Sequence, residues 1–433
     1  MHFIKKFYLW RFFAMKNAKK LVLITTSIII AGMIILYSCK SYTGPGKRNI
    51  FEEGGDYILP ANFLSQEEQY SPIGPDSQAR VLFTNECKIP ALTISSRGTL
   101  IAAVGCGTTK GKLIGKRSSD FGKTWTEFTA FIDDANPSSY AHPFFINCHN
   151  GDILLGISTT NLTENKTSFY RSTTDGSSWT KENNAEINLT NICANATSAF
   201  VTYGQGVTLR HGTNKSLLFP YFYSNAKPKS TSNTNGRFTA TMISTNDGRT
   251  WKQHGADYGS FATSETKFIE SSDGKVLLNM RADAGNQIYW MVSENCGETW
   301  AIKTSGAIEQ HSESHADLIR YEFNGKDIKS GSGSKYALIT YSDKQNKSYG
   351  VKMTVNDFNG GAGSFNSKYI YNKLIASNLT DANDIYPAIT VLPDGTIATL
   401  AEETNNMVFR RFNLSWLSGE EEYIDYDIDN ILK

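Results

Sequence analysis

The chain has 433 residues, with 43 Lys and Arg against 42 Asp and Glu, so its formal net charge is +1. This balance gives no support to nucleic-acid binding, which needs a basic surface. Tyr, Phe and Trp are plentiful, Pro is sparse and amphipathic helical patterns are hard to find, which predicts an all-β protein. The roughly 390 residues that follow an N-terminal segment suffice for one large domain or two ordinary ones.

Residues 1–39 have the pattern of a bacterial lipoprotein signal peptide. Three lysines precede an apolar run over residues 21–36, and a small residue stands directly before Cys39. Such a sequence is typical of export followed by lipid attachment to the Cys. We expect Cys39 to carry the lipid, Met15 to be an alternative true start, and the protein to be anchored to a membrane of the cell envelope. A short, tilted signal-anchor helix is the alternative.

Five further cysteines follow, namely Cys87, Cys106, Cys148, Cys193 and Cys296. An odd number in an exported chain leaves at least one thiol unpaired. A disulfide between the first two is one option that the sequence alone does not establish. Because the chain has no CxxC pair and no His-flanked cluster, we predict no metal site.

Residues 40–79 are polar and are predicted to be a tether, whereas residues 80–433 alternate strands and turns. Hairpins are predicted where Asn-Gly, Asp-Gly or Arg-Gly separates two apolar runs. These turns fall at Arg97-Gly98, Asn150-Gly151, Asp273-Gly274 and Asp394-Gly395. With two more hairpins over residues 205–220 and 336–355, each taken as the inner pair of a blade, the chain is predicted to have six blades.

One short pattern, Ser-x-(Asp/Asn/Thr)-x-Gly-x-(Ser/Thr)-Trp, occurs four times. The copies are Ser118–Trp125, Ser172–Trp179, Ser244–Trp251 and Ser293–Trp300. A short polar side chain followed by Gly is typical of a turn, and the closing Trp is expected to cover the turn against a core. The spacing of roughly 50–70 residues fits one four-stranded blade of a β-propeller.

The pattern resembles the Asp-box of the sialidase (neuraminidase) superfamily, which implies a six-bladed β-propeller over residues 80–433. Propellers without enzymatic activity carry Asp-boxes too, so the repeat predicts the fold and leaves catalysis open. An enzyme that removes sialic acid attacks a carbon bearing a carboxylate, which repels a carboxylate nucleophile. A neutral Tyr activated by Glu avoids that repulsion, and Arg binds the substrate carboxylate through two hydrogen bonds.

Two segments resemble the family's catalytic stretches. Residues 264–281 contain a Glu, a hairpin and then an Arg at the family spacing, so the resemblance implies a base at Glu265 and a carboxylate-binding Arg281. Residues 385–402 match the stretch that carries the nucleophilic Tyr, here Tyr386, and after its hairpin a Glu that braces the first cation. That Glu is Glu402.

The chain departs from the family at three positions. Lys88 stands where the first Arg of the triad is expected, and a Lys offers a point charge instead of a planar fork. Lys347 is the best match to the third Arg; Lys344, Arg210 and Arg320 are the other candidates.

The general acid of the family aligns near Lys112, and residues 105–117 contain no Asp or Glu. Asp133 and Asp134 are the nearest carboxylates in sequence that remain as candidates.

Three functions follow from these residues. The first is an exported hydrolase that releases sialic acid or a related acidic sugar from glycoconjugates. The second is a propeller that binds sialylated or acidic glycans without cutting them, and the third is a structural protein with a vestigial pocket. We expect a monomer with no cofactor, a carbohydrate partner, a membrane contact through the lipid, and no nucleic acid.

Overall fold

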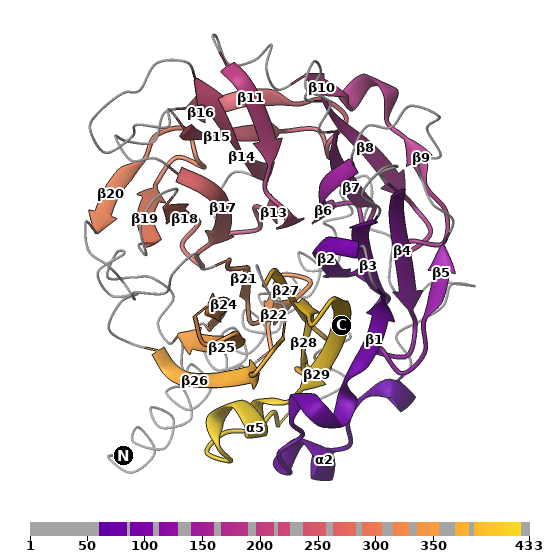
Figure 1. The fold of residues 1–433 in the computed structure, drawn as a ribbon. Helices are drawn as coiled ribbons and strands as arrows, with labels where there is room; N and C mark the ends of the chain where they lie inside the picture. Colours follow the sequence, from indigo (N-terminus) through magenta and orange to yellow (C-terminus); the bar gives the residue numbers. More distant parts are fainter. Residues whose placement is uncertain are drawn as a thin grey trace, which may run out of the picture. The chain divides into compact units, whose positions relative to one another are not determined.

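The computed structural model describes residues 60–84, 87–106, 112–128, 140–159, 166–188, 196–211, 215–225, 237–256, 263–282, 288–304, 315–328, 336–343, 345–354, 369–380 and 385–425. Within these residues six sheets form a ring, and Figure 1 shows their inner strands facing a common centre. The predicted six-bladed β-propeller is confirmed. Among the described residues no helix is long and apolar enough to cross a membrane. The predicted signal peptide with Cys39 lies outside these residues.

The strands of the first three blades follow one another from the axis outward. The first blade contains β2 (Cys87–Ile94), β3 (Leu100–Cys106), β4 (Lys112–Ser118) and β5 (Thr126–Phe128). The second contains β6 (Tyr140–Asn147), β7 (Ile153–Thr159) and β8 (Lys166–Ser172), with β9 (Thr180–Lys181), η3 (Asn183–Ala185) and β10 (Ile187–Asn188) outermost. The third contains β11 (Ala196–Val201) and β13 (Val207–Thr208), then β14 (Leu217–Asn225), β15 (Arg237–Ser244) and β16 (Lys252–Ala256). Between β11 and β13, β12 (Gly204–Gln205) pairs with β6.

The remaining blades follow the same order. The fourth contains β17 (Thr263–Glu270), β18 (Val276–Ala282), β19 (Ile288–Ser293) and β20 (Ala301–Thr304). The fifth contains β21 (Leu318–Arg320), β24 (Ala337–Asp343), β25 (Ser348–Thr354) and β26 (Tyr369–Ala376), with a small hairpin of β22 (Glu322–Phe323) and β23 (Lys326–Asp327). The sixth contains β27 (Pro387–Val391), β28 (Ile397–Glu403), β29 (Asn406–Phe412) and β1 (Arg80–Phe83). Because β1 comes from the start of the domain, its pairing with β29 closes the ring.

Four inner hairpins close with the same turn. In the first blade Ser95 N donates to Thr99 O at 2.8 Å, and Gly98 N donates to Ser95 O at 2.9 Å. The same two bonds recur around Gly151, Gly274 and Gly395, and all four glycines have φ between 78° and 85°. Glycine adopts this left-handed conformation without a steric penalty, which is why these turns were predictable.

The hairpin predicted over residues 336–355 exists, but its position in the blade was predicted wrongly. It pairs β24 with β25, which are the second and third strands of the fifth blade. The inner strand is β21, only three residues long. The error arose because β21 is too short to show an alternating pattern, and the hairpin of β22 and β23 follows it in the chain before β24.

The four Asp-boxes link the third and fourth strands of the first four blades. In each copy the Ser hydroxyl accepts a hydrogen bond from the Gly N–H at 2.8 Å. Each Gly then packs against the preceding blade: Gly122 against Phe409, Gly176 against Ile101, and Gly248 against Leu154. The motif therefore joins neighbouring blades as well as closing a turn.

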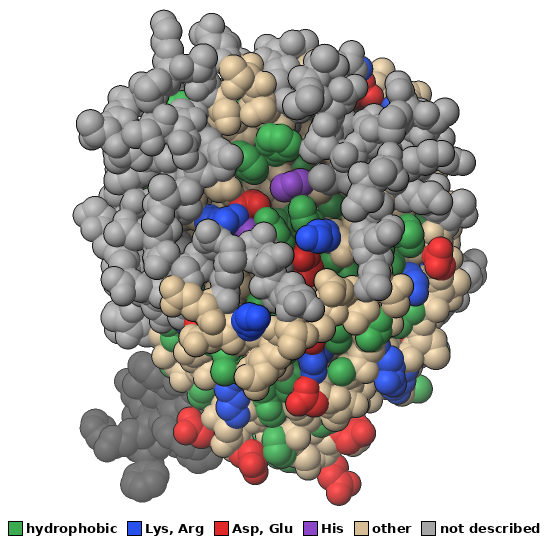
Figure 2. Space-filling view, viewed as in Figure 1, with side chains coloured by type: hydrophobic (Ala, Val, Ile, Leu, Met, Phe, Trp, Pro, Cys, Tyr) green, Lys and Arg blue, Asp and Glu red, His purple; other side chains and the backbone are tan. Residues whose placement is uncertain are grey.

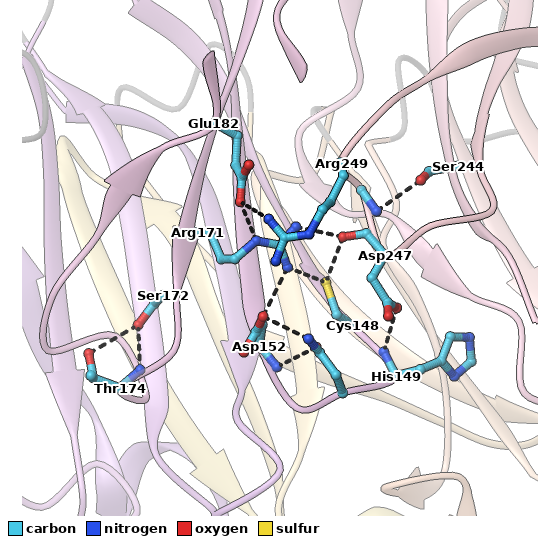
Figure 3. Close-up of polar contacts among 12 residues, drawn as sticks. Cys148, His149, Asp152, Arg171, Ser172, Thr174, Glu182, Ser244, Asp247 and Arg249 are labelled. Atoms are coloured by element: carbon cyan, nitrogen blue, oxygen red, sulfur yellow. Dashed lines mark hydrogen bonds and ion pairs between the residues drawn. The ribbon is translucent and has the colours of Figure 1, made fainter. Parts of the chain in front are cut away.

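A buried arginine strengthens one of these joints, as Figure 3 shows. Arg171 on β8 donates to Asp247 O of the third Asp-box at 2.6 Å and to Asp152 Oδ2 at 3.1 Å, and it also pairs with Glu182. The Cys148 thiol lies 3.6 Å from the same guanidinium. Since every partner is polar and close, the network satisfies a charge that would be costly to bury alone.

Residues 60–78 are not the tether predicted from their polar composition. They form η1 (Pro60–Asn62), α2 (Gln66–Tyr70) and η2 (Pro75–Gln78), which pack against the sixth blade and α5 (Leu414–Ser418). Phe63 is buried beside Phe121, and the Asn413 side chain donates to Ser71 O at 2.7 Å. Composition misled here because the polar groups are satisfied by the propeller instead of by water.

Substituting Gly248 by Ala should destabilise the propeller more than the same change at Gly151. Both glycines have positive φ, but only at Gly248 would the new Cβ overlap a buried side chain, that of Leu154. We expect Gly151→Ala to lower the free energy of unfolding by about 1 kcal/mol and Gly248→Ala by a further ~1–3 kcal/mol. Urea unfolding of both variants measures this, and equal losses would contradict the inter-blade role.

Candidate active site

Tyr386, Glu265 and Arg281 meet at one end of the propeller axis. Tyr386 directly precedes β27, Glu265 lies near the start of β17, and Arg281 lies near the end of β18. Tyr386 Oη donates to Glu265 Oε1 at 2.9 Å, and Arg281 Nη1 donates to Glu265 Oε2 at 2.5 Å. The contact expected between Glu265 and Arg281 is thus present, and Figure 2 shows acidic, basic and histidine side chains gathered near the centre of this face.

A bulge in the inner strand places Glu265 at the axis. Thr263 lies opposite Ala282 and Thr266 lies opposite Met280, so β17 has one residue more than its partner between these pairs. The inner strands β2 and β6 have the same irregularity, around Ile89 (φ 58°) and His142 (φ 59°). A bulge changes the direction in which the side chains of a strand point. In these three blades the regular alternation of side chains is therefore interrupted at the same end of the axis.

The Glu265 carboxylate is 8% exposed and is held ionised by its neighbours. Burial alone would raise its pKa, but nearby positive charge, including that of the Arg281 guanidinium, more than offsets burial and brings the pKa of Glu265 well below its ordinary value. A phenol bonded to a carboxylate can pass its proton to that carboxylate, which makes the phenol oxygen a nucleophile. Tyr386 is half-buried, whereas Glu265 is buried.

Two aromatic side chains surround the Tyr386 ring. The His315 ring lies against it with 3.6 Å between the ring centroids, and the Tyr203 ring meets it edge-on at 5.0 Å. Tyr203 is fully buried, and its hydroxyl donates to Ala316 O at 3.3 Å and Pro387 O at 3.4 Å. These contacts fix the direction of the phenol.

A buried ion pair lies directly beneath this centre. Lys267 Nζ is 3.3 Å from Asp317 Oδ1 and 3.7 Å from the centroid of the Tyr203 ring. Asp317 Oδ2 also accepts from Ile389 N at 3.1 Å. Burial lowers the pKa of Lys267 and raises that of Asp317, and each charge offsets part of the effect on the other. Lys267 lies on β17 and Ile389 on β27, and Asp317, directly before β21, bonds to both. Asp317 therefore connects the inner strands of the fourth and sixth blades.

The predicted substrate-binding residues lie at the same end of the blades. Lys88 is exposed on β2, and the next residue, Ile89, donates its N–H to Glu402 Oε1 at 2.6 Å. Lys347 is exposed in the turn between β24 and β25, with φ 47°. In the described residues the Lys347 side chain has no ion pair, and its backbone oxygen accepts from Leu379 N at 3.0 Å.

A disulfide joins Cys87 to Cys106, which was one of the pairings left open by the sequence. It connects β2 to β3 next to Lys88, so it fixes the end of the first blade at the site. Cys148 is buried and Cys296 is half-buried, and Cys193 lies outside the described residues. Among the described residues no three His, Cys, Asp or Glu side chains could hold a metal ion.

Two alternatives for the third cation lie at the other end of the axis. Arg320 pairs with Glu322 at 3.0 Å and Asp327 at 3.4 Å, and Arg210 lines the same region. There a cavity of about 120 Å³ is bounded by the far ends of the inner strands, and Tyr386 is not part of its lining. Neither Arg can serve a ligand at Tyr386. Asp133, Asp134 and Lys344 lie outside the described residues.

Sequence reasoning missed His315, Tyr203 and Lys267 at this centre. His315 precedes a three-residue strand that was not recognised as the inner strand of its blade. Lys267 follows Glu265 by two residues on the same strand, but the bulge between Thr263 and Thr266 interrupts the alternation of side chains there, so the spacing alone did not place the two side chains together.

The fold and the centre define a class, namely Asp-box β-propellers with a Tyr–Glu–Arg cluster at one end of the axis. No protein-family model matches the chain. A sialidase of Micromonospora viridifaciens is 25% identical to it over 369 residues, covering 77% of this chain and 52% of that protein. The chain thus spans about half the length of this relative.

Solved structures share the fold. The intramolecular trans-sialidase from Ruminococcus gnavus, in complex with oseltamivir carboxylate, superposes with a TM-score of 0.61 at 14% identity, covering 80% of this chain and 99% of that chain. The leech intramolecular trans-sialidase, complexed with 2,7-anhydro-Neu5Ac, has a TM-score of 0.62 at 15% identity, covering 82% and 73%. The chain is a sialidase-like β-propeller.

Replacing Glu265 by Gln should change how stability depends on pH. The pKa of Glu265 is lowered by folding, so the ionised carboxylate adds stability above the ordinary Glu value of about 4.3, and this is lost as the pH falls below it. We expect the wild type to lose more unfolding free energy than Glu265→Gln between pH 6 and pH 3. Urea titrations test this, with Glu67→Gln on the surface of α2 as control. Parallel losses in wild type and Glu265→Gln would contradict it.

Proposed function

We propose that the chain is an exported glycoside hydrolase that releases terminal sialic acid or a related acidic sugar from glycoconjugates. The observation that carries this proposal is the hydrogen bond of 2.9 Å between Tyr386 Oη and Glu265 Oε1, with Arg281 on the other carboxylate oxygen. Tyr386 Oη attacks the anomeric carbon while its proton passes to Glu265, and the glycosidic oxygen leaves with the electron pair of the bond that breaks. Water then replaces the Tyr386 oxygen on the anomeric carbon, which releases the sugar, and Glu265 returns the proton to Tyr386. Arg281 and Lys88 bind the substrate carboxylate, and Lys347 contributes a third cation from its turn.

The weak point of the hydrolytic centre is the general acid. Residues 105–117, which align with the family's acid, contain no Asp or Glu. Without an acid the leaving oxygen departs unprotonated, which costs roughly 10²–10⁴ in rate for a poor leaving group. We therefore propose that the protein cleaves glycosides of acidic alcohols, such as phenols, far faster than ordinary sugar linkages.

The second candidate is a protein that binds sialylated or acidic glycans without cutting them. It is favoured by the absence of a carboxylate over residues 105–117 and by Lys88 in place of an Arg. Arg281 and the exposed Lys88, which lie at the same end of the blades, still suit an anionic sugar.

For location we propose the cell envelope, with the protein anchored as a monomer through a lipid on Cys39. This rests on the signal-like composition of residues 1–39.

Tyr386→Phe should abolish release of the aglycone from an aryl sialoside, because the nucleophilic oxygen is removed while the ring contacts with His315 and Tyr203 remain. We expect a fall in rate of at least about 10³. Initial rates by absorbance measure it, with Tyr70→Phe on the exposed face of α2 as the matched control. If both variants keep the wild-type rate, the nucleophile is another residue.

Lys88→Arg should tighten substrate binding. Arg adds a second parallel hydrogen bond to a carboxylate, worth about 1 kcal/mol or more, so we expect KM for the aryl sialoside to fall by about fivefold or more. Lys88→Met should raise KM, because it removes the charge. If neither substitution changes KM, Lys88 does not contact the substrate.

A further inference from the structure

His315 contacts all three members of the Tyr386–Glu265–Arg281 centre. Its ring lies on the Tyr386 ring at 3.6 Å between centroids, and its Nδ1 is 3.4 Å from Arg281 Nη1 and 3.9 Å from Glu265 Oε2. A guanidinium can only donate, so Nδ1 accepts the hydrogen bond from Arg281. This requires a neutral imidazole whose proton is on Nε2.

The backbone of His315 is anchored by the next strand. His315 N donates to Ser342 Oγ at 2.9 Å, and two residues later Asp317 N donates to Thr340 Oγ1 at 2.9 Å. The Asp317 carboxylate is held in turn by Lys267. Because the backbone of His315 is fixed by these hydrogen bonds, its side chain can hold the groups that it contacts in place.

His315 is not a substitute for the missing general acid. Its side chain is 1% exposed and is covered by the Tyr386 ring. An acid must reach the leaving oxygen, which is on the opposite side of the anomeric carbon from the attacking Tyr386. The Glu265 and Arg281 contacts place the imidazole on the Tyr386 side.

We propose that His315 is a positioning residue with two separable tasks, an inference that rests on the function proposed above. Its Nδ1 holds the Arg281 guanidinium in the orientation that binds the substrate carboxylate. Its ring holds the Tyr386 phenol in the direction of attack. The first task acts on substrate binding and the second on the chemical step.

Two substitutions separate these tasks. His315→Phe keeps a ring against Tyr386 and removes the acceptor for Arg281, so KM for an aryl sialoside should rise about fivefold while kcat stays within about twofold. His315→Asn keeps an acceptor oxygen near the place of Nδ1 and removes the ring, so kcat should fall about fivefold with little change in KM. His254→Asn and His254→Phe, on β16 of the third blade, are the matched controls.

Ligand-free crystal structures of both variants provide a readout that needs neither turnover nor binding. In His315→Phe we expect Arg281 to leave its wild-type rotamer while Tyr386 keeps it, and the reverse in His315→Asn. Wild-type rotamers of both residues in both variants, or KM and kcat changing in the same proportion in both, would overturn the proposal. Absence of turnover in the wild type would count against the proposed hydrolase, and the two crystal structures would still decide the role of His315.

Discussion

The buried carboxylate of Glu265 is the group on which the centre depends, because each of its oxygens serves a different partner. Tyr386 donates to one oxygen at 2.9 Å and Arg281 to the other at 2.5 Å. An ionised carboxylate that is only 8% exposed is costly to bury unless its oxygens are bonded. The same two contacts therefore stabilise the carboxylate charge and align the phenol with the guanidinium. A substitution that removes either contact should affect both the stability of this region and its chemistry.

Several features hold these partners in place. The bulge in β17 turns Glu265 toward the axis, and the disulfide between Cys87 and Cys106 fixes the first blade beside it. Below, Lys267 and Asp317 connect three blades in a layer from which water is largely excluded. Since each blade contributes only one or two residues, the geometry of the site depends on the closure of the ring, where β1 pairs with β29. The Asp-boxes maintain the spacing between neighbouring blades.

Features encoded locally were predictable from the sequence, whereas features that depend on distant contacts were not. Glycine turns such as Asp273-Gly274 predicted the hairpins, and one of those hairpins predicted the contact of Glu265 with Arg281. His315 was missed because its strand is short and its partners come from other blades. The packing of residues 60–78 was missed because their polar groups bond to Asn413 and Asp394, which are more than 300 residues away in sequence.

The most direct test of the proposed chemistry is to trap the covalent intermediate. A sialosyl fluoride with a second fluorine at C3 slows hydrolysis of the intermediate, and its fluoride leaving group needs no general acid. Peptide mass spectrometry after incubation should find the sugar attached to Tyr386, and no adduct should form with Glu265→Gln. An adduct on another residue would contradict the Tyr386–Glu265 pair as the reacting groups. A bound sugar with no adduct would establish the propeller as a binding protein.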